Sequence, residues 1–69
     1  MLDNDPPPGT NVRFTKDVRT PLRTAKALST AKLVRAIGVY REDRPGDQFE
    51  VEYLGERITV RRDDIERAP

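Results

Sequence analysis

One stretch, "DQFEVEYLGERITVRR" at residues 47–62, constrains the fold more than any other part of the chain. Its apolar and charged residues alternate, which is the period of a β-strand with one buried face. Gly55 and the residue after it suit a two-residue type II′ turn, because glycine in the first turn position readily adopts a positive φ. This turn gives the cross-strand pairs Tyr53 with Ile58 and Val51 with Val60. The stretch therefore predicts a β-hairpin whose apolar side chains share one face.

Charged residues are expected on the other face of this hairpin. Glu50 and Glu52 would lie close to Arg57 on the neighbouring strand. Cross-strand pairs of opposite charge stabilise a sheet by roughly 0.2–1 kcal/mol each. The hairpin is thus predicted to have an apolar core face and a charged solvent face.

Alternation elsewhere predicts the remaining strands. Residues 11–18, "NVRFTKDV", and residues 33–42, "LVRAIGVYRE", both show it, although Arg35 falls on the same face as Leu33 and Ile37. "DRPG" at residues 43–46 favours a turn after the second of these strands. A further turn at Asp63 and Asp64 would lead to a last short edge strand over residues 65–68.

Residues 19–32 allow two interpretations. Thr20 followed by Pro21 is typical of a helix start, and several apolar residues cluster on a helical wheel. The lysines and the serine of the segment fall within the same arc, which argues against a full helix. We expect a long loop with one or two helical turns, and the alternative is a helix over residues 21–37.

Composition decides how the apolar face must be covered. The chain has 69 residues and neither cysteine nor histidine, so disulfides and structural zinc sites cannot stabilise it. A flat sheet would leave its apolar face in water, whereas a sheet curled into a small barrel buries it without a helix layer. The expected core is Val12, Phe14, Val18, Leu33, Ile37, Val39, Phe49, Val51, Tyr53, Ile58, Val60 and Ile65. The prediction is an all-β barrel of about five strands over residues 10–69, after a disordered proline-rich tail over residues 1–9.

Several segments together resemble the small SH3-like barrels. The matching pieces are "GTNVRF", "IGVYRED" and "DQFEVEYLGERITVRRDDIE", which span nearly all of residues 9–67. The departure from the pattern is the longer basic segment at 19–32. This resemblance implies an SH3-like fold, but proteins of that fold include RNA-binding modules, peptide binders and accessory subunits, so it does not select a function.

The residue types argue against catalysis and against a membrane. Without histidine or cysteine, a nucleophile with a histidine base cannot be built, and Ser29 is the only serine. The four glycines lie far apart, so there is no glycine-rich phosphate loop. We expect no enzyme activity, no catalytic residue, no cofactor, no metal site and no small-molecule substrate. No apolar run approaches the ~20 residues of a membrane helix, and the N-terminus has no signal-peptide pattern, so the expected location is the cytoplasm.

An uneven charge distribution is the main functional signal. Residues 11–40 carry seven basic residues and one acid, whereas residues 41–69 carry six arginines and nine acids. The candidate partner-binding residues are Arg13, Arg19, Arg23, Lys26, Lys32 and Arg35. The leading hypothesis is a protein-docking module or accessory subunit of a larger assembly, with an acidic protein as partner. The alternative is an RNA- or DNA-binding module that uses the basic segment 13–35, although aromatic residues for base stacking are sparse there.

Overall fold

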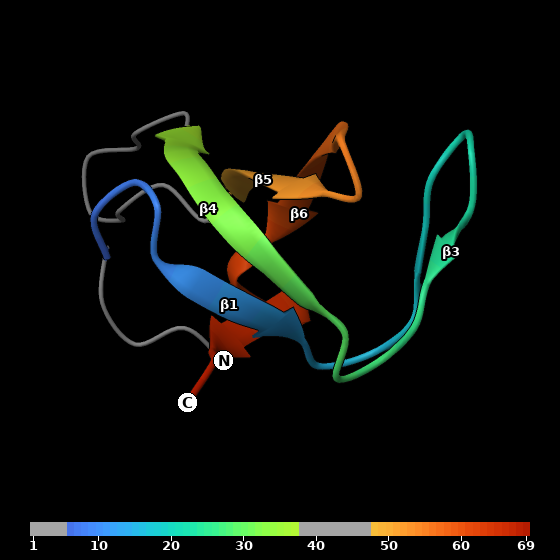
Figure 1. The fold of residues 1–69 in the computed structure, drawn as a ribbon, viewed down its shortest axis with the longest axis horizontal. Helices are drawn as coiled ribbons and strands as arrows, with labels where there is room; N and C mark the ends of the chain where they lie inside the picture. The colour runs from blue at the N-terminus through green and yellow to red at the C-terminus, as the bar shows by residue number, and fades with distance from the viewer. Residues whose placement is uncertain (1–5, 38–47) are drawn as a thin grey trace.

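Five antiparallel strands in the order β6-β5-β4-β1-β7 form the main sheet, and β2 with β3 forms a separate two-stranded hairpin (Figure 1). This arrangement comes from a computed structural model, which describes residues 6–37 and 48–69. The strands are β1 (Asn11–Phe14), β2 (Val18–Arg19), β3 (Thr24–Ala25), β4 (Thr30–Ile37), β5 (Gln48–Tyr53), β6 (Glu56–Arg61) and β7 (Ile65–Arg67). A single 3₁₀ turn, η1 (Arg62–Asp64), joins β6 to β7. The protein is therefore a small all-β domain, with no α-helix in the described residues.

The connection between β6 and β7 shows that the sheet is strongly curled. These strands are the two edges of the sheet, so four strand spacings of about 4.8 Å would separate them by about 19 Å if the sheet were flat. The 3₁₀ turn rises by only about 2 Å per residue and bridges about 8 Å. The sheet must curl until its edges approach each other at this end. The edges are not paired with each other among the described strands, so the sheet is not a closed barrel.

The core lies on the concave face of the sheet and draws on almost every strand. Phe14 from β1 and Phe49 from β5 are its largest side chains, and both are fully buried. The rings of Phe14 and Tyr53 pack at right angles to each other, with their centroids 5.5 Å apart. The other buried residues are Val12, Ala25, Ala31, Leu33, Val51, Ile58, Val60 and Ile65, with Val18 and Tyr53 packed against them. The expected core is largely confirmed, but the two alanines are additions, Ile37 is only half-buried, and Val39 lies outside the described residues.

The β5–β6 hairpin exists, but its predicted register is wrong. Val51 pairs with Ile58 and Tyr53 with Glu56, because the turn residues are Leu54 and Gly55. Both have positive φ, 51° and 82°, which is the type I′ geometry that matches the twist of the strands. Moving the turn by one residue shifts each cross-strand partner by two. The side chains therefore keep their faces, and the prediction of an apolar face opposite a charged face is confirmed.

The segment over residues 19–32 forms neither a long loop nor a helix. It contains the end of β2, a tight turn, all of β3 and the start of β4. Thr20 does not cap a helix, because its hydroxyl instead closes the β2–β3 turn through contacts with the backbone of Leu22 and Arg23. The helical interpretation of residues 21–37 is also wrong, because Thr30–Ile37 is a β-strand.

A bulge in β4 resolves the conflict that the sequence shows at Arg35. Leu33 pairs with Val51, but the register then shifts, and Arg35 pairs with Glu50. The extra residue, Val34, reverses which face the following side chains take. Leu33 is therefore buried, whereas Arg35 lies on the solvent face beside a carboxylate. The expected turn at 43–46 lies outside the described residues.

Residues 6–9, the last part of the expected tail, contact the start of the sheet. The Gly9 amide donates to the carbonyl of Leu33 over 2.7 Å, and the Thr10 hydroxyl donates to the carbonyl of Pro7 over 2.6 Å. Pro6 is buried. Residues 1–5 of the expected tail lie outside the described residues.

Asp64 holds the turn between β6 and β7 together. Its Oδ2 accepts a 3.0 Å hydrogen bond from the amide of Arg61, and its Oδ1 lies 3.0 Å from Lys16 Nζ, although no well-aligned hydrogen bond reaches Oδ1. Burial raises the pKa of this carboxyl, but the Arg61 amide and the Lys16 ammonium outweigh burial and hold the pKa below its usual value. The ionised form therefore stabilises the fold.

Replacing Asp64 by asparagine should destabilise the protein near neutral pH by about 0.5–1 kcal/mol. The pKa of Asp64 is lower in the folded than in the unfolded protein, so the ionised side chain stabilises the fold. This stabilisation is complete well above the unfolded-state pKa of about 3.9, and it is lost as the pH falls through the folded-state pKa. The difference between parent and variant in urea unfolding should thus shrink on acidification. Asp63→Asn is the control, because Asp63 is exposed. A difference at Asp64 that persists unchanged in acid would contradict this role for its charge.

Candidate functional site

The six candidate basic residues do not form one patch. Arg13 lies on β1, where it pairs with Glu66 of β7 over 2.5 Å. Lys32 and Arg35 lie on β4, on the solvent face of the main sheet. Arg19, Arg23 and Lys26 belong to the β2–β3 hairpin or directly follow it. The sequence groups these residues, but the fold separates them into three places.

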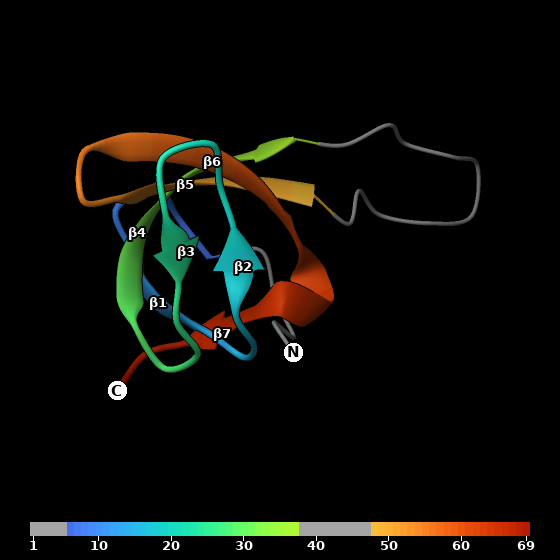
Figure 2. The ribbon, with the colours of Figure 1, turned by 90° about the vertical axis from the view of Figure 1, so that its right-hand side faces the viewer.

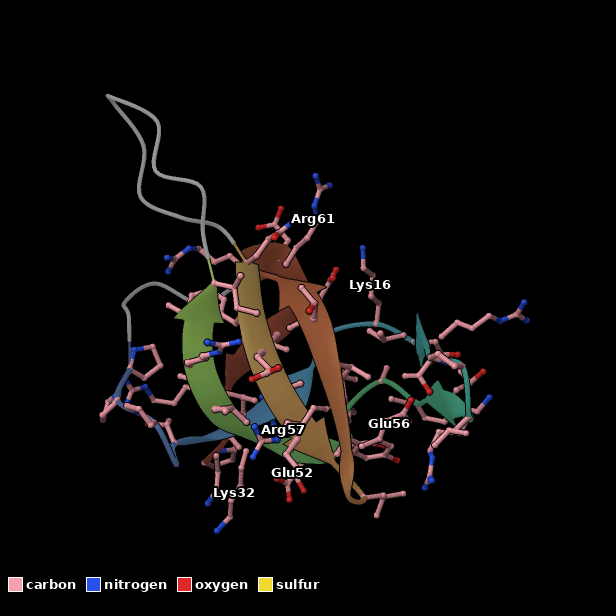
Figure 3. The ribbon with its side chains drawn as sticks, turned by 90° about the horizontal axis from the view of Figure 1, so that it is seen from above. Lys16, Lys32, Glu52, Glu56, Arg57 and Arg61 are labelled. Carbon is pink, nitrogen blue, oxygen red and sulfur yellow. The ribbon has the colours of Figure 1, made fainter. Side chains whose placement is uncertain are left out.

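Lys32 and Arg35 belong to rows of charge that cross the solvent face of the sheet. Lys32 lies opposite Glu52, which in turn lies opposite Arg57, and Figure 3 shows these three side chains together. Arg35 Nε lies 3.3 Å from Glu50 Oε1, and Arg57 lies 4.0 Å from both Glu50 and Glu52. Such pairs stabilise a sheet and keep its surface solvated. On this face each of these three cations has a carboxylate neighbour, which offsets much of its attraction for a polyanion.

The β2–β3 hairpin stands in front of the curled sheet, and Figure 2 shows it face-on. Hydrogen bonds join its base to β1, where the Leu28 amide donates to Phe14 O over 2.8 Å and the Phe14 amide donates to Ser29 O over 3.0 Å. Ala25 is fully buried and Val18 packs against the core. The hairpin is therefore an ordered part of the fold.

A single carboxylate fixes the tip of the hairpin. Glu56 of β6 lies on the side that faces the hairpin (Figure 3), and its side chain is only 11% exposed. Its Oε1 lies 2.8 Å from the Thr20 hydroxyl and 3.6 Å from Arg23 Nε. Thr20 is itself buried. Arg23 therefore serves the attachment of the hairpin and is less available to a partner than the sequence suggests.

The outward side of the hairpin combines exposed positive charge with an apolar side chain. Arg19 is exposed and has no carboxylate within ion-pair distance among residues 6–37 and 48–69. Lys26 is highly exposed and forms an ion pair with the exposed Asp17 over 3.9 Å. Leu22 at the tip is 72% exposed. We call Arg19, Leu22 and Lys26 the hairpin surface.

Sequence reasoning missed three residues that define this region: Thr20, Leu22 and Glu56. The contact between Thr20 and Glu56 joins residues 36 positions apart, so no local pattern could reveal it. Leu22 lies in the apolar cluster of the alternative helix over residues 21–37, which does not form, and it is not among the expected core residues. The one available signal was the proline after Thr20, which suits a tight turn as well as a helix start.

The described part of the chain offers few groups for binding metals, stacking on bases or crossing a membrane. No cluster of three or more acidic side chains there could hold a metal ion. Phe14 and Phe49 are fully buried and Tyr53 packs against the core, so these rings have little surface for stacking on bases. No helix among residues 6–37 and 48–69 combines the length and apolar character that crossing a membrane requires.

Comparisons with protein-family models, with curated proteins and with solved structures find no match to this chain.

Proposed function

We propose that this protein is a non-enzymatic binding module that docks an acidic segment of a protein partner on the hairpin surface, as an accessory part of a larger assembly. The observation that carries the proposal is the β2–β3 hairpin itself. It is held at its base by Phe14 and at its tip by Glu56, yet its outward side chains Arg19, Leu22 and Lys26 contribute little to the core. An ordered element with exposed charge is preorganised for binding, because little conformational freedom remains to be lost.

We further propose that the curled sheet is an SH3-like barrel that remains open between its edge strands β6 and β7. The short β6–β7 connection supports this assignment, because it brings the edges of the sheet close to each other at one end. The core supports it as well, because the edge strands β6 and β7 both contribute buried side chains. The long basic segment that departs from the family pattern is the hairpin that carries the proposed site.

Charge pairing favours a protein partner over nucleic acid. Arg13 and Arg35, two of the candidate phosphate contacts, already have carboxylate partners. A nucleic-acid backbone that extended from the hairpin onto the sheet would meet Glu50 and Glu52. A short acidic peptide needs only the hairpin. Salt-dependent attraction is expected in both cases, so salt dependence alone does not separate them.

Reversing the charges of Arg19 and Lys26 together, to glutamate, should weaken binding of an acidic peptide by about tenfold or more. The probe is a 12-residue peptide of glutamate and leucine, titrated against the ¹⁵N-labelled protein at low salt. We expect amide shift changes concentrated in residues 18–26. The control is the double reversal of Arg61 and Arg67, which changes the net charge equally and lies outside the hairpin.

A single-stranded oligonucleotide of equal charge tests the alternative. Tighter binding of the oligonucleotide than of the peptide, spread over β1 and β4, would support the nucleic-acid module and overturn the proposal. Equal losses in both double variants would show that only net charge matters. Absence of salt-dependent binding to either probe would remove the basis for a docking function at the hairpin.

A further inference from the structure

Two exposed leucines occupy backbone positions that leucine normally avoids. Leu54 has φ 51° in the β5–β6 turn, and Leu28 has φ 70° in the turn before β4. Left-handed backbone is unfavourable for residues with a branched side chain, and glycine or asparagine is preferred in such turns. Both side chains are also largely exposed, at 67% for Leu54 and 68% for Leu28. Neither leucine gains burial that would offset its strained backbone.

The fold places Leu54 near the tip of the hairpin, where Leu22 lies, and Leu28 at its base, in the same turn as Lys26. Glu56 follows the turn that carries Leu54, and its carboxylate accepts the Thr20 hydroxyl. The same hydroxyl lies 3.3 Å from the Leu22 amide, so the turns that carry Leu22 and Leu54 meet at Glu56. Leu28 lies at the base of the hairpin, where its amide contacts Phe14. Figure 1 shows the tip and the base of this hairpin at opposite ends.

We infer that Leu54 and Leu22 form the apolar half of the docking surface, so that the bound segment carries apolar side chains among its acidic ones. Arg19 and Lys26 on the same hairpin supply the charge complementarity for the acidic part. A strained and exposed leucine close to the hairpin tip fits a role in contact with a partner rather than in stability. This inference rests on the proposed function and specifies its partner.

Replacing Leu54 by asparagine should raise the melting temperature and weaken binding at once. Asparagine followed by Gly55 suits the type I′ turn, and relief of this strain is expected to raise Tm by about 4–8 °C. The variant should bind the glutamate–leucine peptide about tenfold more weakly, because a leucine contact is lost. For an all-glutamate peptide with the same charge as the glutamate–leucine peptide, the variant and the parent protein should have equal affinity. Leu22→Asn should show the same change in binding without the rise in Tm.

Leu28→Asn is the matched control, since it relieves a similar backbone conformation at the other end of the hairpin. We expect it to raise Tm but to leave binding of both peptides unchanged. Full binding by the Leu54 and Leu22 variants, with loss confined to the Arg19 and Lys26 reversal, would overturn this inference and leave the docking function standing. Failure of the parent to bind either peptide would overturn both.

Discussion

Replacing Phe14 by alanine is expected to leave the chain unfolded at room temperature. Truncation of a buried phenylalanine costs about 3–5 kcal/mol. A single core in a chain of this size rarely supplies more than about 3–5 kcal/mol in total. The sequence offers no disulfide or thiolate metal site to compensate. The variant should lose the cooperative thermal transition in circular dichroism and the amide dispersion of a folded protein.

The position of Phe14 makes it more important than other core residues. Its ring packs at right angles to that of Tyr53, and its backbone holds the base of the β2–β3 hairpin through Leu28 and Ser29. Loss of the ring would therefore loosen both the core and the hairpin. Phe14→Leu is the control, because it keeps most of the side-chain volume and should remain folded with reduced Tm. A cooperatively folded alanine variant with Tm within a few degrees of the parent would show that the core does not depend on this residue.

The faces of the strands could be predicted from the sequence, whereas the exact pairing could not. Alternation fixes which side chains point inward, and a shift of two residues leaves that assignment intact. The choice between turns at Leu54-Gly55 and Gly55-Glu56 depends on backbone twist. The sequence favours the second option because glycine in the first position permits a type II′ turn. The structure instead places Leu54 in the first position with a φ of 51°, which is rare for leucine.

The hairpin within residues 19–32 is hard to recognise in the sequence because the large apolar residues of this segment are not its buried ones. Leu22 and Leu28 suggested the face of a helix, but both are exposed. Ala25 and Ala31 are buried instead, since small side chains let the hairpin and β4 approach the core closely. Hydrophobic periodicity gives weight to large residues and cannot detect such contacts.

The sequence identifies the candidate basic residues, but it does not show which of them have carboxylate partners in the fold. Arg13 and Glu66 lie 53 positions apart in the sequence, and only the pairing of β1 with β7 brings them together. Arg35 reaches Glu50 only because of the bulge in β4. Charge counting along the chain treats these arginines as equal to Arg19, which has no such partner in the described residues. Non-local pairing therefore decides which cations remain available to a ligand.

The difference between paired and unpaired cations changes the expected effect of charge reversal in the hairpin on protein stability. From the sequence alone, reversal of Arg19, Arg23 and Lys26 would leave stability unchanged, because exposed charges contribute little. Arg23 does not meet that condition, since its guanidinium lies 3.6 Å from the nearly buried Glu56 carboxylate. Its effect must be separated from those of its two neighbours.

Arg23→Glu is expected to destabilise the protein by about 1–2 kcal/mol, because it leaves a largely buried carboxylate facing a second one. Arg19→Glu should change stability by less than about 0.5 kcal/mol. The measurement is urea unfolding, combined with hydrogen exchange of the amides of Leu22 and Arg23, which contact the Thr20 hydroxyl. Exchange there should accelerate more than in β5 if the hairpin tip detaches before the whole fold opens.

A double-mutant cycle with Glu56→Gln identifies the cause. Glutamine keeps an acceptor for the Thr20 hydroxyl but removes the charge that would repel a glutamate at position 23. Arg23→Glu should therefore cost much less in the Glu56→Gln background than in the parent, with a coupling of about 0.5 kcal/mol or more. Equal costs in both backgrounds would mean that Arg23 does not act through Glu56. In that case the hairpin tip is held by Thr20 and the buried Ala25 alone, and Arg23 rejoins Arg19 and Lys26 as a cation available for docking.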